Sequence, residues 1–141
     1  MSKVYNPGLL KLLNGTIDFD TDTIKLLLVD TNHTFTKSHE FVSDIVANEA
    51  SGTGYSRKTL ANADILEDFA NDRVKFDADD ISYTALDAGT IASAIIYKEV
   101  TNDADSPLIA DVDFTDLVTN GSDVDLRVNA DGFFFITNDV T

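Results

Sequence analysis

Cysteine and tryptophan are absent from this sequence, and histidine occurs only twice. Without cysteine the chain forms no disulfides and no thiolate metal sites. Without tryptophan, a carbohydrate-binding platform is less expected. His33 and His39 lack the spacing of metal ligands on one helix or strand, and the sequence shows no nucleophile or orienting acid for a catalytic histidine. We therefore expect no enzymatic activity and no cofactor.

Positive charge is also scarce, with 10 lysines and arginines against 25 acidic residues and a net charge of −15. Such a surface repels phosphate backbones and anionic lipids, so we expect no direct nucleic-acid or membrane partner. The charge fits solubility at high local concentration, or else a basic or cation-rich partner. No run approaches the ~20 apolar residues of a membrane helix, and the start lacks a signal-peptide pattern. We expect synthesis in the cytoplasm without membrane insertion.

The 141 residues predict one domain, residues 1–141. Its first segment predicts a short helix, because Asn6 suits the N-cap and Pro7 the first helical position. Residues 14–15, Asn-Gly, form a good helix stop. Apolar side chains cover more than one face of this helix, so residues 1–15 form either an interface arm or a helix folded onto its own domain. The candidate interface residues are Tyr5, Leu9, Leu10, Leu12 and Leu13.

The rest of the chain mainly predicts β-strands. Residues 24–29 are almost continuously apolar, which indicates a strand buried on both faces. Residues 81–86 and 123–128 alternate between polar and apolar, and residues 129–132 predict a turn into a hairpin with residues 133–136. In all we expect a mainly β fold: an antiparallel β-sandwich or jelly-roll-like domain of about eight strands.

A second short helix is predicted after Ser38, which is an N-cap candidate. Apolar residues follow it at helical spacing, and they would form one face of the helix. These residues are Phe41, Val42, Ile45 and Val46. The fold would then have one or two short helices, both near the N-terminus.

Three patterns resemble ligand-binding motifs but are incomplete. Asp18, Asp20 and Asp22 match the first half of a calcium-binding loop, but its later glycine and glutamate are replaced. We interpret this run, and residues 77–80, as solvated turns, with a weak surface calcium site as the alternative. The glycine-rich residues 51–55, followed by Arg57 and Lys58, lack the spacing of a nucleotide-binding loop.

Seven segments, in order along nearly the whole chain, carry a resemblance to a known family: residues 12–26, 39–45, 51–55, 74–80, 95–98, 106–110 and 131–134. They resemble a family of small virion proteins of tailed bacteriophages. Two departures are visible: residues 56–58 are Ser-Arg-Lys where the family often has further glycines, and Tyr83 stands where it often has tryptophan.

This resemblance implies a structural protein of the virion. We expect a capsid decoration (cement) protein at the capsid surface, with the major capsid protein as partner and self-association as a homotrimer. One alternative is a tail component, either a tail-tip protein or a tail-tube protein; a tube protein usually needs a long protruding hairpin, for which the sequence offers no clear candidate. Another is a host-surface or glycan-binding module, for which Tyr55, Tyr83 and Tyr97 are the available aromatic residues.

Overall fold

A computed structural model describes residues 2–139, which form one α-helix, three short 3₁₀ turns and ten strands. The helix α1 spans Asn6–Leu13, and the turns are η1 (Val42–Asp44), η2 (Val46–Asn48) and η3 (Phe69–Asn71). The strands are β1 (Ser2–Val4), β2 (Ile24–Asp30), β3 (Lys58–Thr59), β4 (Asp64–Asp68), β5 (Arg73–Asp77), β6 (Ile81–Leu86), β7 (Thr90–Lys98), β8 (Leu108–Val118), β9 (Ser122–Leu126) and β10 (Phe134–Thr137).

All strand pairs in the described residues are antiparallel, and they form three sheets. The main sheet has the order β1-β8-β7-β2-β3, a second has β10-β5-β4, and a third pairs β6 with β9. The predicted mainly β, antiparallel class is therefore confirmed. The strand number is higher than expected because β1 and β3 are only three and two residues long, too short to show a pattern in the sequence.

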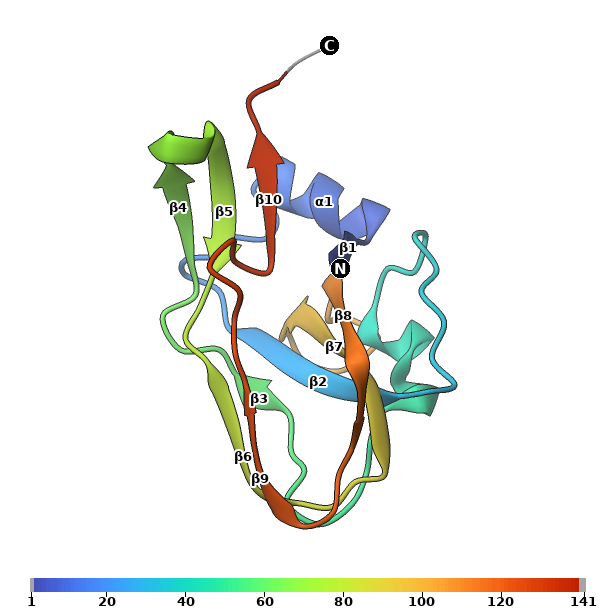
Figure 1. Ribbon diagram of the computed structural model, residues 1–141. Coiled ribbons are helices and arrows are strands. Elements are labelled where there is room, and N and C mark those ends of the chain that lie inside the picture. Colours follow the sequence, from blue (N-terminus) through green and yellow to red (C-terminus); the bar gives the residue numbers. More distant parts are fainter. Residues whose placement is uncertain (1, 140–141) are drawn as a thin grey trace.

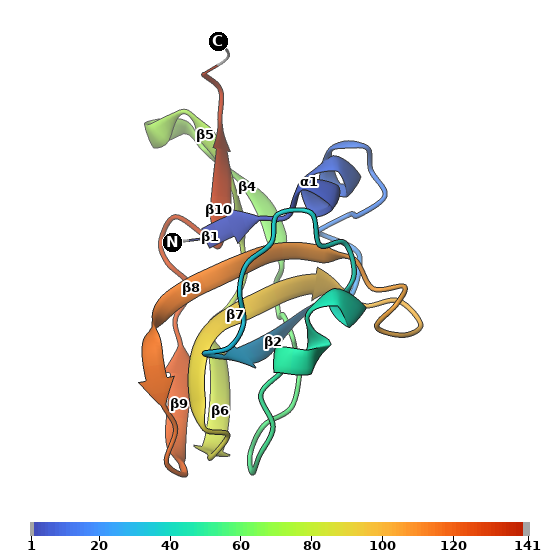
Figure 2. The ribbon, with the colours of Figure 1, turned by 90° about the vertical axis from the view of Figure 1, so that its right-hand side faces the viewer.

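The main sheet is covered on both faces. On β2, Leu26 and Leu28 enter a core shared with the other two sheets, whereas Leu27 and Val29 face a second core under residues 31–50. Figure 2 shows this second cover, with the η1–η2 segment lying beside the curved strands β2 and β7. The near-continuous apolar run of β2 thus reflects burial on both faces, as predicted.

The helix α1 lies against β8 of its own domain. Gly8 makes this possible, because a Cβ atom at this position would lie 2.2 Å from the carbonyl oxygen of Leu108. The Tyr5 backbone N–H donates to the carbonyl of Ile109 at 3.0 Å and fixes the approach of the helix. The predicted helix is confirmed, and of its two predicted arrangements the structure has the one that packs on the domain.

The predicted hairpin at the C-terminal end is wrong. Its two strands form, but β9 pairs with β6 and β10 pairs with β5, so they belong to different sheets. The intervening turn exists, with Gly132 N–H donating to the Asn129 carbonyl at 2.8 Å. It directs the chain away from β9, and Phe133 N–H then bonds to the Phe76 carbonyl at 2.7 Å. Pairing with β5 therefore replaces the local return.

The predicted second helix is also wrong: η1 and η2 are separate 3₁₀ turns. Bonds to other parts of the chain take the backbone groups that a helix would use. Val42 N–H donates to the Ser106 carbonyl at 2.9 Å, and Ser43 N–H to the Asp103 carbonyl at 3.0 Å. The apolar residues still point inward, since Val42 and Ile45 are buried in the second core.

The sheet of β4, β5 and β10, together with η3, extends beyond the main sheet at the end of the molecule that also carries α1 (Figure 1). We call it the projecting sheet. Its base is anchored by aromatic contacts: Phe76 stacks on Phe134 with ring centroids 4.3 Å apart, and Phe19 meets Phe76 edge-on at 5.4 Å. The sheet is therefore fixed to the core at one end and exposed at the other.

Candidate functional site

The five predicted interface residues of the N-terminal segment divide into two groups. Tyr5 is fully buried and packs against Phe35, with ring centroids 4.9 Å apart, so its side chain is occupied within the domain. Leu12 packs against the main core and Leu9 is partly buried. Leu10 and Leu13 are 63% and 72% exposed. Only these two leucines present a large apolar surface to another molecule.

Exposed apolar residues also gather on the projecting sheet. Cross-strand register places Ile65, Phe76 and Phe134 side by side on one face, and Leu66 and Phe135 beside Lys75 on the other. The tip carries Phe69, which is 81% exposed in η3. The large apolar side chains exposed on this sheet and its tip are Ile65, Leu66, Phe69, Phe135 and Ile136. Sequence reasoning missed this surface, because β4 alone shows no clear pattern.

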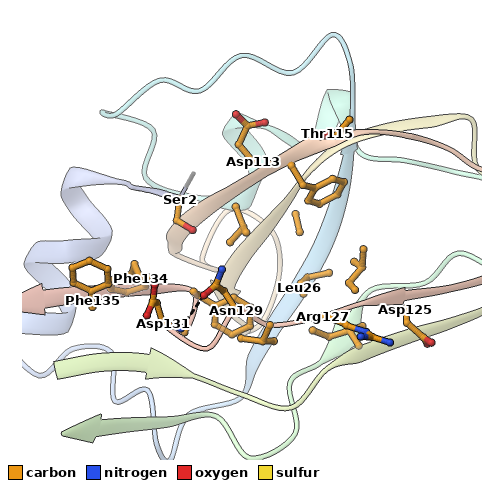
Figure 3. Close-up of a pocket in the computed structure, with 18 of the residues that line it drawn as sticks. Ser2, Leu26, Asp113, Thr115, Asp125, Arg127, Asn129, Asp131, Phe134 and Phe135 are labelled. Carbon is orange, nitrogen blue, oxygen red and sulfur yellow. Dashed lines mark hydrogen bonds between the residues drawn. The ribbon is translucent and has the colours of Figure 1, made fainter. Parts of the chain in front are cut away.

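An apolar groove lies between β8 and the connection from β9 to β10 (Figure 3). Its volume is about 960 Å³. Leu26, Ile81 and Ala94 lie at its floor, and each is at most 7% exposed. Its apolar walls are Val112, Phe114 and Leu117 of β8 and Leu126, Val128, Phe133 and Phe134 of the opposite side. The groove is open because β8 belongs to the main sheet and β9 to the β6–β9 sheet, and these two strands do not pair with each other.

The wall opposite β8 is held in place by bonds to neighbouring elements. Val128 N–H donates to a carboxylate oxygen of Asp80 at 2.8 Å, and Lys75 Nζ donates to the Ala130 carbonyl at 2.9 Å. Arg73 also pairs with Asp131 at the end of this wall. The groove is therefore preformed, and no rearrangement is needed to open it.

A buried histidine–aspartate hydrogen bond lies between the main sheet and residues 31–50. His33 Nε2 lies 3.0 Å from Asp111 Oδ2, and both side chains are 5% exposed. Ser93 is also buried, but its hydroxyl has no hydrogen-bond partner, so these three residues do not assemble a nucleophilic triad. The pair fastens residues 31–50 onto β8. The sequence gives no signal for it, because the partners are 78 positions apart.

The aspartate runs serve local structure. Asp18 Oδ1 accepts the Asp20 N–H at 3.2 Å, Asp20 Oδ1 accepts the Ile65 N–H at 3.0 Å, and Asp22 pairs with Lys98 at 2.8 Å. Within residues 2–139, no group of three or more histidine, cysteine or acidic side chains could hold a metal ion.

The glycine-rich loop packs against backbone. A Cβ atom at Gly52 would lie 2.1 Å from the Asp87 carbonyl oxygen. Arg57, the candidate phosphate contact, is engaged by two carboxylates: its NH2 group donates to Glu49 and its NH1 group to Asp103, both at 2.6 Å. These bonds raise the pKa of Arg57 above its ordinary value. The loop thus has a structural explanation.

The three candidate tyrosines do not form an exposed aromatic platform. Tyr83 and Tyr97 are 1% exposed. Tyr55 stacks on Tyr83 with ring centroids 6.2 Å apart and donates its hydroxyl hydrogen to Glu49 at 2.7 Å. Burial, followed by the hydrogen bond to Glu49, raises the pKa of Tyr55. These rings stabilise the interior.

Comparisons with protein-family models, curated proteins and solved structures found no match. Among the described residues, no helix is long and apolar enough to cross a membrane. The functional argument therefore rests on two surfaces: the groove, and the exposed apolar residues of the projecting sheet and α1.

Proposed function

We propose that this chain is a structural protein of a tailed-bacteriophage virion, and specifically a capsid decoration (cement) protein. In this role it binds the outer surface of the head, self-associates as a homotrimer and stabilises contacts between major capsid subunits. The in-order resemblance of its segments to small virion proteins supports the virion assignment. Its surface supports a role in assembly.

The observation that carries the proposal is the set of exposed apolar residues at one end of the molecule. Phe69 is 81% exposed, Leu13 72% and Leu10 63%. Soluble monomers rarely leave large apolar surfaces uncovered, and such patches commonly mark interaction sites. The same end carries α1 and the projecting sheet (Figure 1), so one contact with a neighbouring subunit would engage both.

The net negative charge of the chain is compatible with dense packing of many copies on a shell. A net charge of −15 keeps the solvent-facing surface highly soluble where many copies lie close together on a shell. Repetition of a modest interface around a shell then adds avidity, because each oligomer binds through several subunits.

One observation favours a tail-tube protein as the second candidate. Strands β4 and β5 form a hairpin that protrudes from the domain, a feature that the sequence did not reveal. In a tube, hairpins of neighbouring subunits would line a ring. This hairpin is short, with strands of five residues each, so decoration remains our proposal.

Purified particles from the genome that encodes this chain provide the test. Mass spectrometry should find the chain in multiple copies per particle, and a particle reconstruction should place its density on the head. Absence from the particle would overturn the virion assignment, and density in the tail would replace decoration with the tail candidate.

Matched variants connect the test to the surface. Exchange of both exposed leucines, Leu10→Ser with Leu13→Ser, should reduce incorporation into particles. Val100→Ser is the control, because Val100 is 46% exposed in the loop between β7 and β8 and belongs to neither α1 nor the projecting sheet. Equal incorporation of both variants would show that the leucines are not the contact.

A further inference from the structure

We propose that the groove between β8 and the β9–β10 connection binds an extended, basic segment of a partner protein, which adds as a strand to the edge of β8. This is a second contact, separate from the apolar end of the molecule, and it does not depend on the virion assignment. Four observations carry it: the edge of β8, the position of β1, the shape of the groove and its charge.

The edge of β8 is only partly paired. On the side away from β7, β1 pairs with Ala110, Asp111 and Val112, and no strand in the described residues pairs with Phe114–Val118. A strand edge presents a row of N–H and C=O groups that can pair with an added chain. The groove-lining part of β8 therefore offers main-chain bonds as well as apolar contacts.

Strand β1 shows the geometry that the edge accepts. Ser2 lies opposite Val112 in an antiparallel register, and both Ser2 and Val4 line one end of the groove. An added strand that continues the line of β1 would run beside the part of β8 that follows Val112, which includes Phe114 and Leu117 of the groove lining. The groove is thus the continuation of a strand position that this domain already fills at one end.

The shape of the groove selects an extended chain with alternating side chains. In a strand, every second side chain points to the same face, so alternate residues would enter the floor formed by Leu26, Ile81 and Ala94. Chains that bind in this way gain affinity from main-chain bonds and specificity from alternate side chains. A small apolar molecule could fill the floor, but it would leave the edge of β8 without partners.

The charge at the rim selects a basic segment. Asp113 and Asp125 line the groove, Asp131 lies at its end in a pair with Arg73, and Arg127 is the one basic residue of the lining, on a chain of net charge −15. A second copy is a poor occupant, because it carries the same net charge of −15. One of its edge strands, β4, also reads Asp-Ile-Leu-Glu-Asp and would place like charges against this rim. Lysine or arginine at the outward positions of a foreign strand would complement it.

Selection from a displayed library of short random peptides on the full-length protein tests the proposal. Enriched peptides should alternate apolar and polar residues and carry net positive charge. A synthetic peptide of the enriched sequence should slow amide hydrogen exchange at residues 114–118. If nothing is enriched, or if enriched peptides protect other parts of the chain, the proposal is overturned.

Two variants and one control locate the binding. Phe114→Arg places a charge in the groove, and Thr115→Pro removes a backbone N–H from the part of β8 that lines it. Each should weaken binding of the synthetic peptide about tenfold or more. Val100→Arg, at an exposed apolar site outside the groove lining, should leave it unchanged.

A folding check and two further results complete the test of the groove. Circular dichroism checks folding; if Phe114→Arg does not fold, Thr115→Pro carries the test, because Thr115 is exposed. Sedimentation that shows self-association of the wild type, abolished by Thr115→Pro, would assign the groove to a second copy and overturn the proposal. Peptide binding that neither variant weakens would do the same.

Discussion

The main sheet and the projecting sheet use the same kinds of apolar residue to different ends. In the main sheet, Leu27 and Ile95 are completely buried, with a packed layer on each face. In the projecting sheet, Ile65 and Phe135 are 38% and 44% exposed although their strands are regularly paired. The main sheet is covered on both faces, whereas the projecting sheet is covered only at its base, where Phe76 and Phe134 join the core. Apolar residues that contribute little to the stability of the monomer point to contacts with other molecules.

The largest expected effect lies in the main sheet. Leu27→Ala should lower the free energy of unfolding by about 2–5 kcal/mol, because it leaves a cavity between tightly packed layers. Leu66→Ala, at a position 37% exposed, should cost about 1 kcal/mol or less. Urea unfolding of both variants measures the difference. Equal losses would contradict the distinction between the two regions.

The junction between the regions should come next. Gly132 has a φ of +74°, and a Cβ atom there would lie 2.3 Å from the Phe76 carbonyl oxygen. Gly132→Ala should therefore destabilise the protein by about 2–4 kcal/mol and loosen β10 from β5. Gly121→Ala is the matched control, since Gly121 has a φ of +86° but no atom within 4 Å of an added Cβ.

Gly121→Ala should lower the free energy of unfolding only by the cost of placing alanine in the left-handed conformation, about 1–2 kcal/mol. Hydrogen exchange of the β10 amides should rise in Gly132→Ala and stay unchanged in Gly121→Ala. The same exchange in both variants would show that the turn does not hold the projecting sheet.

Low pH should weaken the hydrogen bonds between Arg57 and Asp103, and the expected loss of stability is smaller than in the two variants above. Hydrogen bonds from Arg57 hold the pKa of Asp103 below its ordinary value of 3.8. Because the folded pKa is the lower one, this bond stabilises the fold above pH 3.8, and the contribution is lost as the pH falls through the folded value. Thermal unfolding across this range should show a smaller acid-induced loss for Asp103→Asn than for wild type. An unchanged pH profile would contradict this role.

The smallest effect on stability is expected at the tip of the projecting sheet. Phe69→Ser should change the free energy of unfolding by no more than about 0.5 kcal/mol, because the side chain is 81% exposed. Under the proposed function it should nevertheless reduce binding to the particle. Pelleting with particles measures this, and a loss of folding instead of binding would show that Phe69 belongs to the core.

The sequence predicted the elements whose patterns are local. The alternation of residues 81–86 matches the burial of Ile81 and Tyr83, but it fails at Ala85, where a positive φ and a register shift leave Ala85 exposed and Leu86 buried. The projecting sheet was not predictable, because its apolar residues come from β4, β5 and β10 and acquire a common face only through pairing.

The errors arose where distant backbone groups compete with local ones. The predicted helix after Ser38 fails because the N–H groups of Val42 and Ser43 donate to residues sixty or more positions away. The groove has the same origin, since β1, β8 and the β9–β10 connection meet there only after folding. Of the predicted interface, Leu10 and Leu13 are exposed, but spacing alone did not separate them from the buried Tyr5.

The contact of Gly8 with the Leu108 carbonyl has a mechanical consequence. At this point the backbone of the helix contacts the backbone of the strand directly, and no side chain lies between them that could change rotamer. The helix can neither rock nor slide without displacing β8, so α1 and the main sheet respond to force as one stiff body. A pull on Leu10 and Leu13 would pass directly into the best-packed part of the molecule.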